Sequence, residues 1–113
     1  MTLRLLLIRH GLSSFNCEKR VQGRNDLSTL TPKGEEQANN VGEALEGVNI
    51  SAIYSSPLQR ALQTTDKLQA ASNCQLKPII EEKLLEIDLA SWSGLTIDEI
   101  QTLYPNDYKL WRS

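Results

Sequence analysis

The sequence predicts an α/β fold, in which a mainly parallel sheet lies between two layers of helices. Short apolar runs alternate with helix-type patterns in the order strand, helix, strand, helix, strand. This order favours parallel pairing through right-handed crossovers. Each of the two long helix patterns also opens with a proline directly after Ser or Thr, which is typical of a helix start. With 113 residues the chain is expected to form one domain, residues 1–113, near the lower size limit for a sheet covered on both faces.

The first strand is expected at Leu3–Ile8, a nearly continuous apolar run of the kind buried on both faces of a parallel sheet. It ends at Arg9-His10-Gly11. Residues 13–30 are polar and without periodicity, and Gly23 lies among several turn-forming residues. We therefore expect a long loop there, and loops of this length in a small domain are usually functional.

The first long helix is expected to begin at Thr31-Pro32, with the threonine as its cap, and to end near Gly47. Its buried face is predicted to contain Ala38, Val41, Leu45 and Val48. A second strand is expected around residues 52–54.

The second long helix is expected to be capped in the same way, by Ser55-Ser56-Pro57. Its buried face is predicted to contain Leu58, Ala61, Leu62, Thr65, Leu68 and Ala71. A third strand follows at Gln75–Ile80, where Pro78 favours an edge position. Residues 81–95 are expected to be loop-like, and a short helix is expected from Thr96 to Leu103.

Composition excludes several classes of function. A net charge of −2 and a pI near 5.4 give no general affinity for nucleic acid or an anionic membrane. The longest apolar run, Leu5–Ile8, is too short for a membrane span or a signal peptide, so a cytoplasmic protein is expected. Cys17 and Cys74 stand far apart and are expected to be reduced thiols. One histidine and no clustered carboxylates favour neither a metal site nor a cofactor.

Two segments that follow predicted strands could carry chemistry, because ligands bind beyond the carboxyl ends of parallel strands. Arg9-His10-Gly11 offers a cation, an imidazole that can act as nucleophile or base, and a glycine that permits close approach of a ligand. The second segment places Arg60 in the first turn of a helix, where a bound phosphate would offset an otherwise unfavourable cation. The alternatives are a histidine packed at a strand end and an arginine that reaches into water.

Together the two segments would direct two guanidinium groups and one imidazole at a single phosphoryl group. Transfer of that group to a histidine needs a proton donor for the departing alkoxide, a role for a carboxyl whose pKa is raised by burial or by a neighbouring anion. Glu86 is the candidate; its rivals Glu81, Glu82 and Asp88 are expected to be solvated charges. Asn16 and Arg24 could add contacts or could be surface residues.

These residues resemble the histidine phosphatase superfamily, also called the phosphoglycerate mutase-like family. The shared motifs are Leu6-Leu-Ile-Arg-His-Gly11, Asn16, residues 23–26, 30–38 and 53–61, and Leu85-Glu-Ile-Asp88 through Trp92-Ser-Gly94. The resemblance implies that His10 is the phosphorylated nucleophile, that Arg9, Arg60 and Asn16 bind phosphate, and that Glu86 donates the proton. Gly23 and Arg24 would belong to a loop near the substrate.

Several positions depart from the family pattern. The family usually has Glu-Thr where this chain has Leu12-Ser13, and a glycine is common at the position of Ala90. The residues after Glu86 resemble the phosphatase branch more than the mutases. The family's second catalytic histidine is absent, because His10 is the only histidine. The resemblance therefore implies the N-terminal portion of a longer protein, or a naturally truncated one, that binds phosphate better than it catalyses.

The predicted function is hydrolysis of a phosphomonoester through a phosphohistidine on His10. Phosphoglycerate mutase-type transfer and a non-catalytic phosphate-binding or interaction module are the alternatives. A cysteine-dependent phosphatase would need an arginine six positions after its cysteine, where this chain has Gly23 and Ile80. The expected partner is a small phosphorylated metabolite or a phosphoprotein, and the sequence leaves the substrate and the oligomeric state open.

Overall fold

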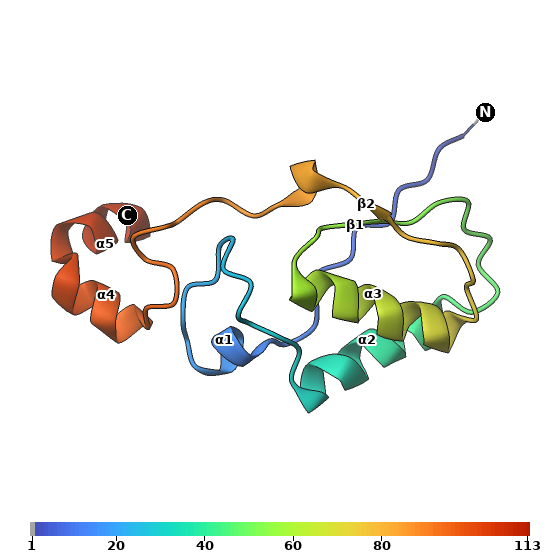
Figure 1. Cartoon of the computed structure of the whole chain (residues 1–113), viewed down its shortest axis with the longest axis horizontal. Helices are drawn as coiled ribbons and strands as arrows, with labels where there is room; N and C mark the ends of the chain where they lie inside the picture. The colour runs from blue at the N-terminus through green and yellow to red at the C-terminus, as the bar shows by residue number, and fades with distance from the viewer. Residues whose placement is uncertain (1) are drawn as a thin grey trace.

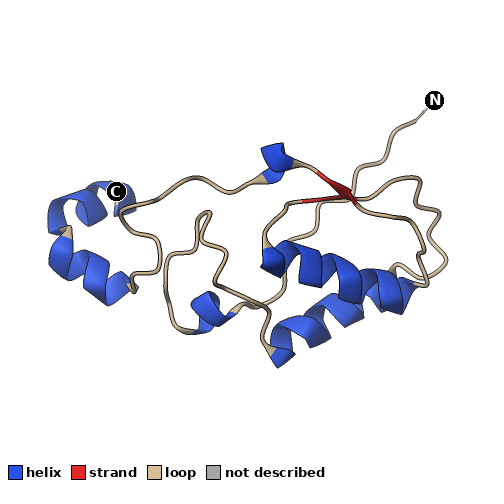
Figure 2. Cartoon of the chain, in the orientation of Figure 1, coloured by secondary structure: helices blue, strands red, loops and turns tan. Residues whose placement is uncertain are grey.

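The elements of the fold alternate between helices and short extended segments. The structure is a computed structural model, and it describes residues 2–113. The elements are α1 (Ser14–Cys17), α2 (Pro32–Ala44), β1 (Tyr54–Ser55), α3 (Gln59–Ser72), β2 (Ile79–Ile80), the 3-10 helix η1 (Glu82–Leu84), α4 (Ile97–Leu103) and α5 (Pro105–Arg112) (Figure 2).

The sheet is parallel, as the sequence predicts. Tyr54 pairs with Ile79 and Ser55 pairs with Ile80, and α3 connects the two strands. The ladder continues beyond the strands, since the Glu81 amide donates to the carbonyl oxygen of Ser55 at 2.9 Å. In Figure 1, α2 and α3 lie on the same side of this strand pair. The α/β class is thereby confirmed, although both strands are shorter than expected.

The N-terminal apolar run does not form the predicted strand. Residues 3–8 lie in no helix or strand, and Leu3 is 88% and Leu7 87% exposed. A strand is stable only where a neighbour completes its hydrogen-bond ladder, and within residues 2–113 no segment pairs with this run. The prediction was wrong because an apolar pattern indicates the kind of surface a segment prefers, not which other segment will pair with it.

Helices α2 and α3 pack against each other through small residues. A Cβ added at Gly42 would overlap the carbonyl oxygen of Leu68, so the two backbones come close. Ala38 and Leu68 are buried at this contact. The predicted face of α2 was partly wrong, since Val41 is 37% and Val48 48% exposed. Close approach of the helices places glycine and alanine at the contact and leaves the valines outside it.

The two long helices begin in different ways. Thr31 caps α2 as predicted, and its Oγ1 accepts a hydrogen bond from the Gly34 amide at 3.0 Å. The predicted cap of α3 at residues 55–57 was wrong, because α3 begins at Gln59 and no side chain of its N-cap residue, Leu58, bonds the backbone. Instead, the Gln59 amide donates to Oδ1 of Asp26 at 2.6 Å. A carboxylate from the long loop therefore satisfies the start of this helix.

The C-terminal helices form a second small core at the far end of the molecule (Figure 1). A capping box at Thr96 starts α4 where a short helix was predicted, and Ile100 is fully buried. Trp92 and Trp111 meet edge to face, with 5.7 Å between ring centroids. The molecule extends over 49 × 33 × 22 Å with a radius of gyration of 16.3 Å, compared with about 13 Å for a compact domain of this length.

Candidate active site

The imidazole of His10 is held in one tautomer by the backbone. Its Nδ1 lies 2.7 Å from the carbonyl oxygen of Gly11. A carbonyl oxygen can only accept a hydrogen bond, so Nδ1 must carry the proton. The lone pair is then on Nε2, and that nitrogen is the available nucleophile.

The surroundings of His10 favour its neutral form. Partial burial is the largest influence lowering its pKa below 6.5, and the positive charges of Arg60 and Arg9 lower the pKa further. The hydrogen bond to Gly11 and the charge of Glu86 act in the opposite direction without reversing the shift. A neutral imidazole at pH 7 is the form that can attack phosphorus. The sequence prediction named His10, Arg9, Arg60 and Glu86, and in the structure the charges of the last three influence the pKa of His10.

Arg60 is buried and binds the long loop. Its side chain belongs to a residue that is only 1% exposed, and its Nη1 and Nη2 donate to the carbonyl oxygens of Asn25 at 2.9 Å and Gly23 at 2.6 Å. The alternative of a solvated arginine was therefore wrong. A guanidinium carries five N–H groups, so three donors remain after these two bonds. Burial lowers the pKa of Arg60, and the charges of Glu86 and Asp26 oppose this effect.

The segment around Glu86 lies against the long loop. Nε of Arg24 donates to the carbonyl oxygen of Glu86 at 2.8 Å. Gly23 has a positive φ of 49°, and a Cβ there would lie 2.9 Å from the carbonyl oxygen of Ile87. Both residues of the predicted substrate loop therefore touch the segment that carries the candidate proton donor. Glu86 itself is an exposed residue, and its role as the proton donor stays a prediction.

The side chain of Asn16 stabilises the start of α1. Its Oδ1 accepts hydrogen bonds from the backbone amide of Ser13 at 3.1 Å and from the Ser13 hydroxyl at 2.8 Å. The bond from the Ser13 amide forms the capping box of α1 together with a bond from the Asn16 amide to the Ser13 hydroxyl at 3.3 Å, and Ser13 is fully buried. A contact between Asn16 and phosphate remains a prediction.

Three polar side chains that the sequence prediction did not assign to the site hold the backbone after His10. The Gly11 amide donates to Oγ1 of Thr64 at 3.0 Å, and the Leu12 amide donates to Oε1 of Gln37 at 2.9 Å. Thr31 contributes both its amide and its hydroxyl to the carbonyl oxygen of Leu12, at 2.9 and 3.0 Å. The His10 loop is thus anchored to both α2 and α3. No sequence signal separates Thr64 and Gln37 from ordinary polar positions on a helix.

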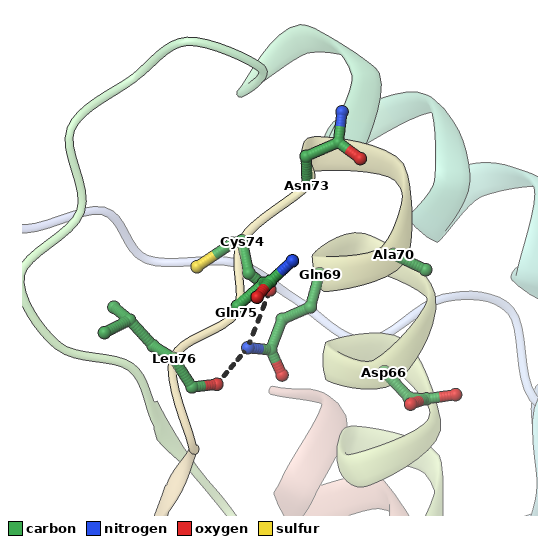
Figure 3. Close-up of a pocket in the computed structure, with 7 residues that line it drawn as sticks. All are labelled: Asp66, Gln69, Ala70, Asn73, Cys74, Gln75 and Leu76. Atoms are coloured by element: carbon green, nitrogen blue, oxygen red, sulfur yellow. Dashed lines mark hydrogen bonds between the residues drawn. The ribbon is translucent and has the colours of Figure 1, made fainter.

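Two cavities differ in their relation to this site. One of about 150 Å³ adjoins His10, and its lining comes from the N-terminal segment, α2 and α3. A larger and shallower pocket of about 360 Å³ lies at the C-terminal end of α3, the end opposite Arg60 (Figure 3). Gln69 spans its floor, with Nε2 donating to the carbonyl oxygens of Leu76 and Cys74. The larger pocket is lined by none of the candidate site residues.

Neither a metal cluster nor a membrane span is found in the part of the chain that the structure describes. Residues 2–113 contain no group of three or more His, Cys, Asp or Glu side chains arranged to hold a metal ion. No helix among them has both the length and the apolar character needed to cross a bilayer.

Comparisons with known proteins identify the family. The sequence profile of the histidine phosphatase superfamily (branch 1) matches residues 5–113. The chain belongs to this superfamily. Among curated relatives, it is 36% identical to phosphoserine phosphatase 1 of Hydrogenobacter thermophilus over 96% of this chain and 50% of that protein. It is also 37% identical to a probable phosphoglycerate mutase of Salmonella choleraesuis, over 87% of this chain and 44% of that protein.

The solved structures agree with this histidine phosphatase assignment. Bacillus stearothermophilus YhfR superposes with a TM-score of 0.82 at 40% sequence identity, covering 91% of this chain and 50% of the other. The chain therefore spans about half the length, or less, of the relatives and the solved structure compared with it here.

Proposed function

We propose that this chain carries the nucleophile and phosphate-binding part of a phosphomonoester hydrolase, which acts through a phosphohistidine on Nε2 of His10. The observation that carries the proposal is the hydrogen bond from His10 Nδ1 to the Gly11 carbonyl oxygen. It leaves the Nε2 lone pair free in an imidazole whose lowered pKa keeps it neutral.

In the first step, Nε2 of His10 forms a bond to phosphorus, and the bond from phosphorus to the ester oxygen breaks. The departing alkoxide takes a proton, for which Glu86 is the candidate donor. The positive charges of Arg9 and Arg60 stabilise the charge spread over the non-bridging oxygens. The products of this step are an alcohol and a phosphohistidine.

In the second step, water attacks the phosphohistidine. The carboxylate of Glu86 accepts a proton from the water as the new oxygen–phosphorus bond forms. The bond from Nε2 to phosphorus breaks, and its electron pair returns to the imidazole. Inorganic phosphate and neutral His10 are regenerated, so the cycle needs no oxidant, reductant or cofactor.

The names of the relatives support a small phosphorylated metabolite as the substrate class. Both curated relatives above are named for enzymes that act on phosphorylated acids of low molecular weight. A phosphoprotein substrate and a cytoplasmic location remain predictions. Mutase-type transfer is the second candidate, because one relative is named as a probable phosphoglycerate mutase. A non-catalytic phosphate-binding module is the third, because the chain has no second histidine.

Incubation of the chain with p-nitrophenyl phosphate tests the proposal. Release of p-nitrophenol that disappears in the His10→Ala variant supports the hydrolase. Binding of inorganic phosphate without turnover favours the module. Transfer of the phosphoryl group between positions of a phosphoglycerate, faster than phosphate release, favours the mutase.

A further inference from the structure

The hydroxyl of Thr64 connects the two halves of the candidate site through one oxygen atom. It accepts a hydrogen bond from the Gly11 amide at 3.0 Å and donates one to the carbonyl oxygen of Arg60 at 2.7 Å. Thr64 is 5% exposed, and both hydrogen bonds are buried. The backbone that follows the nucleophile is thereby joined to the helical turn that carries the buried arginine.

The hydrogen bond from the Thr64 hydroxyl to the Arg60 carbonyl oxygen would not by itself indicate a special role, because a helical threonine often donates to the carbonyl four residues earlier. Thr65 makes the same bond to Ala61 at 2.9 Å. The contact with Gly11 is the difference between these neighbours. An amide held by an acceptor in a buried position would lose a hydrogen bond, with no water to replace it, if the hydroxyl were removed.

The Gly11 backbone also determines the state of His10. The carbonyl oxygen of Gly11 accepts the proton of Nδ1, so its direction decides which nitrogen of the ring keeps a lone pair. Glycine has no Cβ, so its backbone dihedral angles are less restricted than those of any other residue. The direction of this carbonyl must therefore be fixed by outside contacts on both sides of Gly11. Thr64 holds the Gly11 amide at a buried position, and Gln37 accepts a hydrogen bond from the Leu12 amide, which lies in the same peptide plane as the carbonyl.

We propose that Thr64 is a positioning residue that sets the tautomer and orientation of His10 relative to Arg60. Its hydroxyl bonds the Gly11 amide and the Arg60 carbonyl oxygen, and it acts on His10 through the Gly11 backbone. The inference rests on the proposed function for its catalytic meaning, but its structural content can be measured without turnover.

The test uses Thr64→Val, which keeps the shape of the side chain and removes the hydroxyl, and Thr64→Ser, which keeps the hydroxyl. Thr65→Val is the matched control, because it removes a neighbouring hydroxyl that does not contact the His10 loop. The readout is the ¹⁵N spectrum of the imidazole, which belongs to a single residue because the chain has one histidine. The rate of phosphohistidine formation from p-nitrophenyl phosphate is measured in parallel.

We expect a predominant Nδ1–H tautomer in the unsubstituted chain, in Thr64→Ser and in Thr65→Val, and a mixture of tautomers in Thr64→Val. Phosphohistidine formation should fall about tenfold or more in Thr64→Val only, as for the loss of one buried hydrogen bond. An unchanged tautomer in a folded Thr64→Val chain, or an equal change in Thr65→Val, would overturn the inference.

Two further outcomes are informative. If the unsubstituted chain forms no phosphohistidine while the tautomer depends on Thr64, the proposed function fails and the positioning role stands. If Thr64→Val does not fold, hydrogen exchange of the Gly11 amide in the unsubstituted chain decides the question. Slow exchange supports the buried bond to Thr64, whereas exchange as fast as in an open loop contradicts it.

Discussion

The guanidinium of Arg60 donates to the carbonyl oxygen of Gly23 at 2.6 Å, and this bond joins α3 to the long loop after His10. The same guanidinium donates to Asn25, while Asp26 accepts from the first amide of α3. The loop that contacts the Glu86 segment is therefore organised around the arginine that we propose to bind phosphate. Loop order and anion binding should depend on the same side chain.

Arg60→Ala should destabilise the chain by about 3 kcal/mol, because it removes two charge-assisted hydrogen bonds and leaves a cavity. Urea denaturation measures this loss. Arg24→Ala is the control, since Arg24 is exposed and donates a hydrogen bond to a backbone carbonyl oxygen; this variant should lose about 0.5 kcal/mol of stability. Equal losses of stability in the two variants would show that the buried contacts of Arg60 do not stabilise the fold.

Acid should destabilise the fold through His10. The pKa of His10 is lowered from 6.5 in the folded chain, whereas the unfolded chain titrates near the ordinary value. Unfolded molecules therefore take up the proton first, and stability falls as the pH drops from about 6.5 toward the folded pKa. Unfolding by urea between about pH 5 and pH 7.5 measures this effect.

The His10→Asn variant supplies the baseline for the pH dependence that comes from all other groups. The difference in stability between the two chains should change with pH, with the unsubstituted chain losing more as acid is added. A difference that stays constant across the range would contradict a lowered pKa.

The charge of Arg9 should contribute to that pKa, because it is one of the two cations that lower it. Arg9→Gln should move the NMR titration midpoint of His10 upward. Arg4→Gln, a change in the same exposed segment, should leave the midpoint unchanged, since Arg4 is not among the charges acting on His10. Equal shifts in the two variants would indicate a general effect of net charge and not a local one.

The start of α2 should not tolerate a methyl group at Gly34. A Cβ there would overlap the carbonyl oxygen of Leu12 in the His10 loop. Gly34→Ala should therefore destabilise the chain by about 2–4 kcal/mol, although alanine is the better helix former by about 1 kcal/mol. Thermal unfolding measures the change.

Asn40→Ala is the control for that substitution, because Asn40 is an exposed residue of the same helix. It should change stability by no more than about 0.5 kcal/mol. If the Gly34→Ala chain were as stable as the control, the His10 loop would be able to move away from α2 without a loss of stability.

Local signals in the sequence predicted the helix starts that depend on adjacent residues. Thr31 caps α2 as expected, and α4 begins at Ile97, next to the expected start at Thr96; both helix starts are capped within one turn of the chain. The start of α3 was missed because its first amide is bonded by Asp26, 33 positions away along the chain. Leu3–Ile8 was assigned as a strand because periodicity does not report whether a neighbouring strand is present.

In the candidate site, too, features that depend on adjacent residues could be predicted, whereas features that depend on long-range contacts could not. The segments around His10 and Arg60 were singled out by their place after two predicted strands and by the family resemblance, and in the structure the charges of Arg60 and Arg9 lower the pKa of His10. The burial of Arg60 was not predicted, because it depends on contacts between segments that are distant in the sequence. Two carbonyl oxygens of the long loop take the place of water around its guanidinium. Thr64 was missed because its importance lies in one long-range bond to Gly11, and the residue itself is ordinary for a helix.

Detection of the phosphorylated nitrogen tests the central claim most directly. The chain, labelled with ¹⁵N at its single histidine, is mixed with p-nitrophenyl phosphate and quenched in alkali, in which phosphohistidine persists. Coupled ³¹P and ¹⁵N spectra then identify the bonded atom. We predict a phosphoryl group on Nε2 of His10; attachment to Nδ1, or an imidazole that carries no phosphorus, would contradict the account.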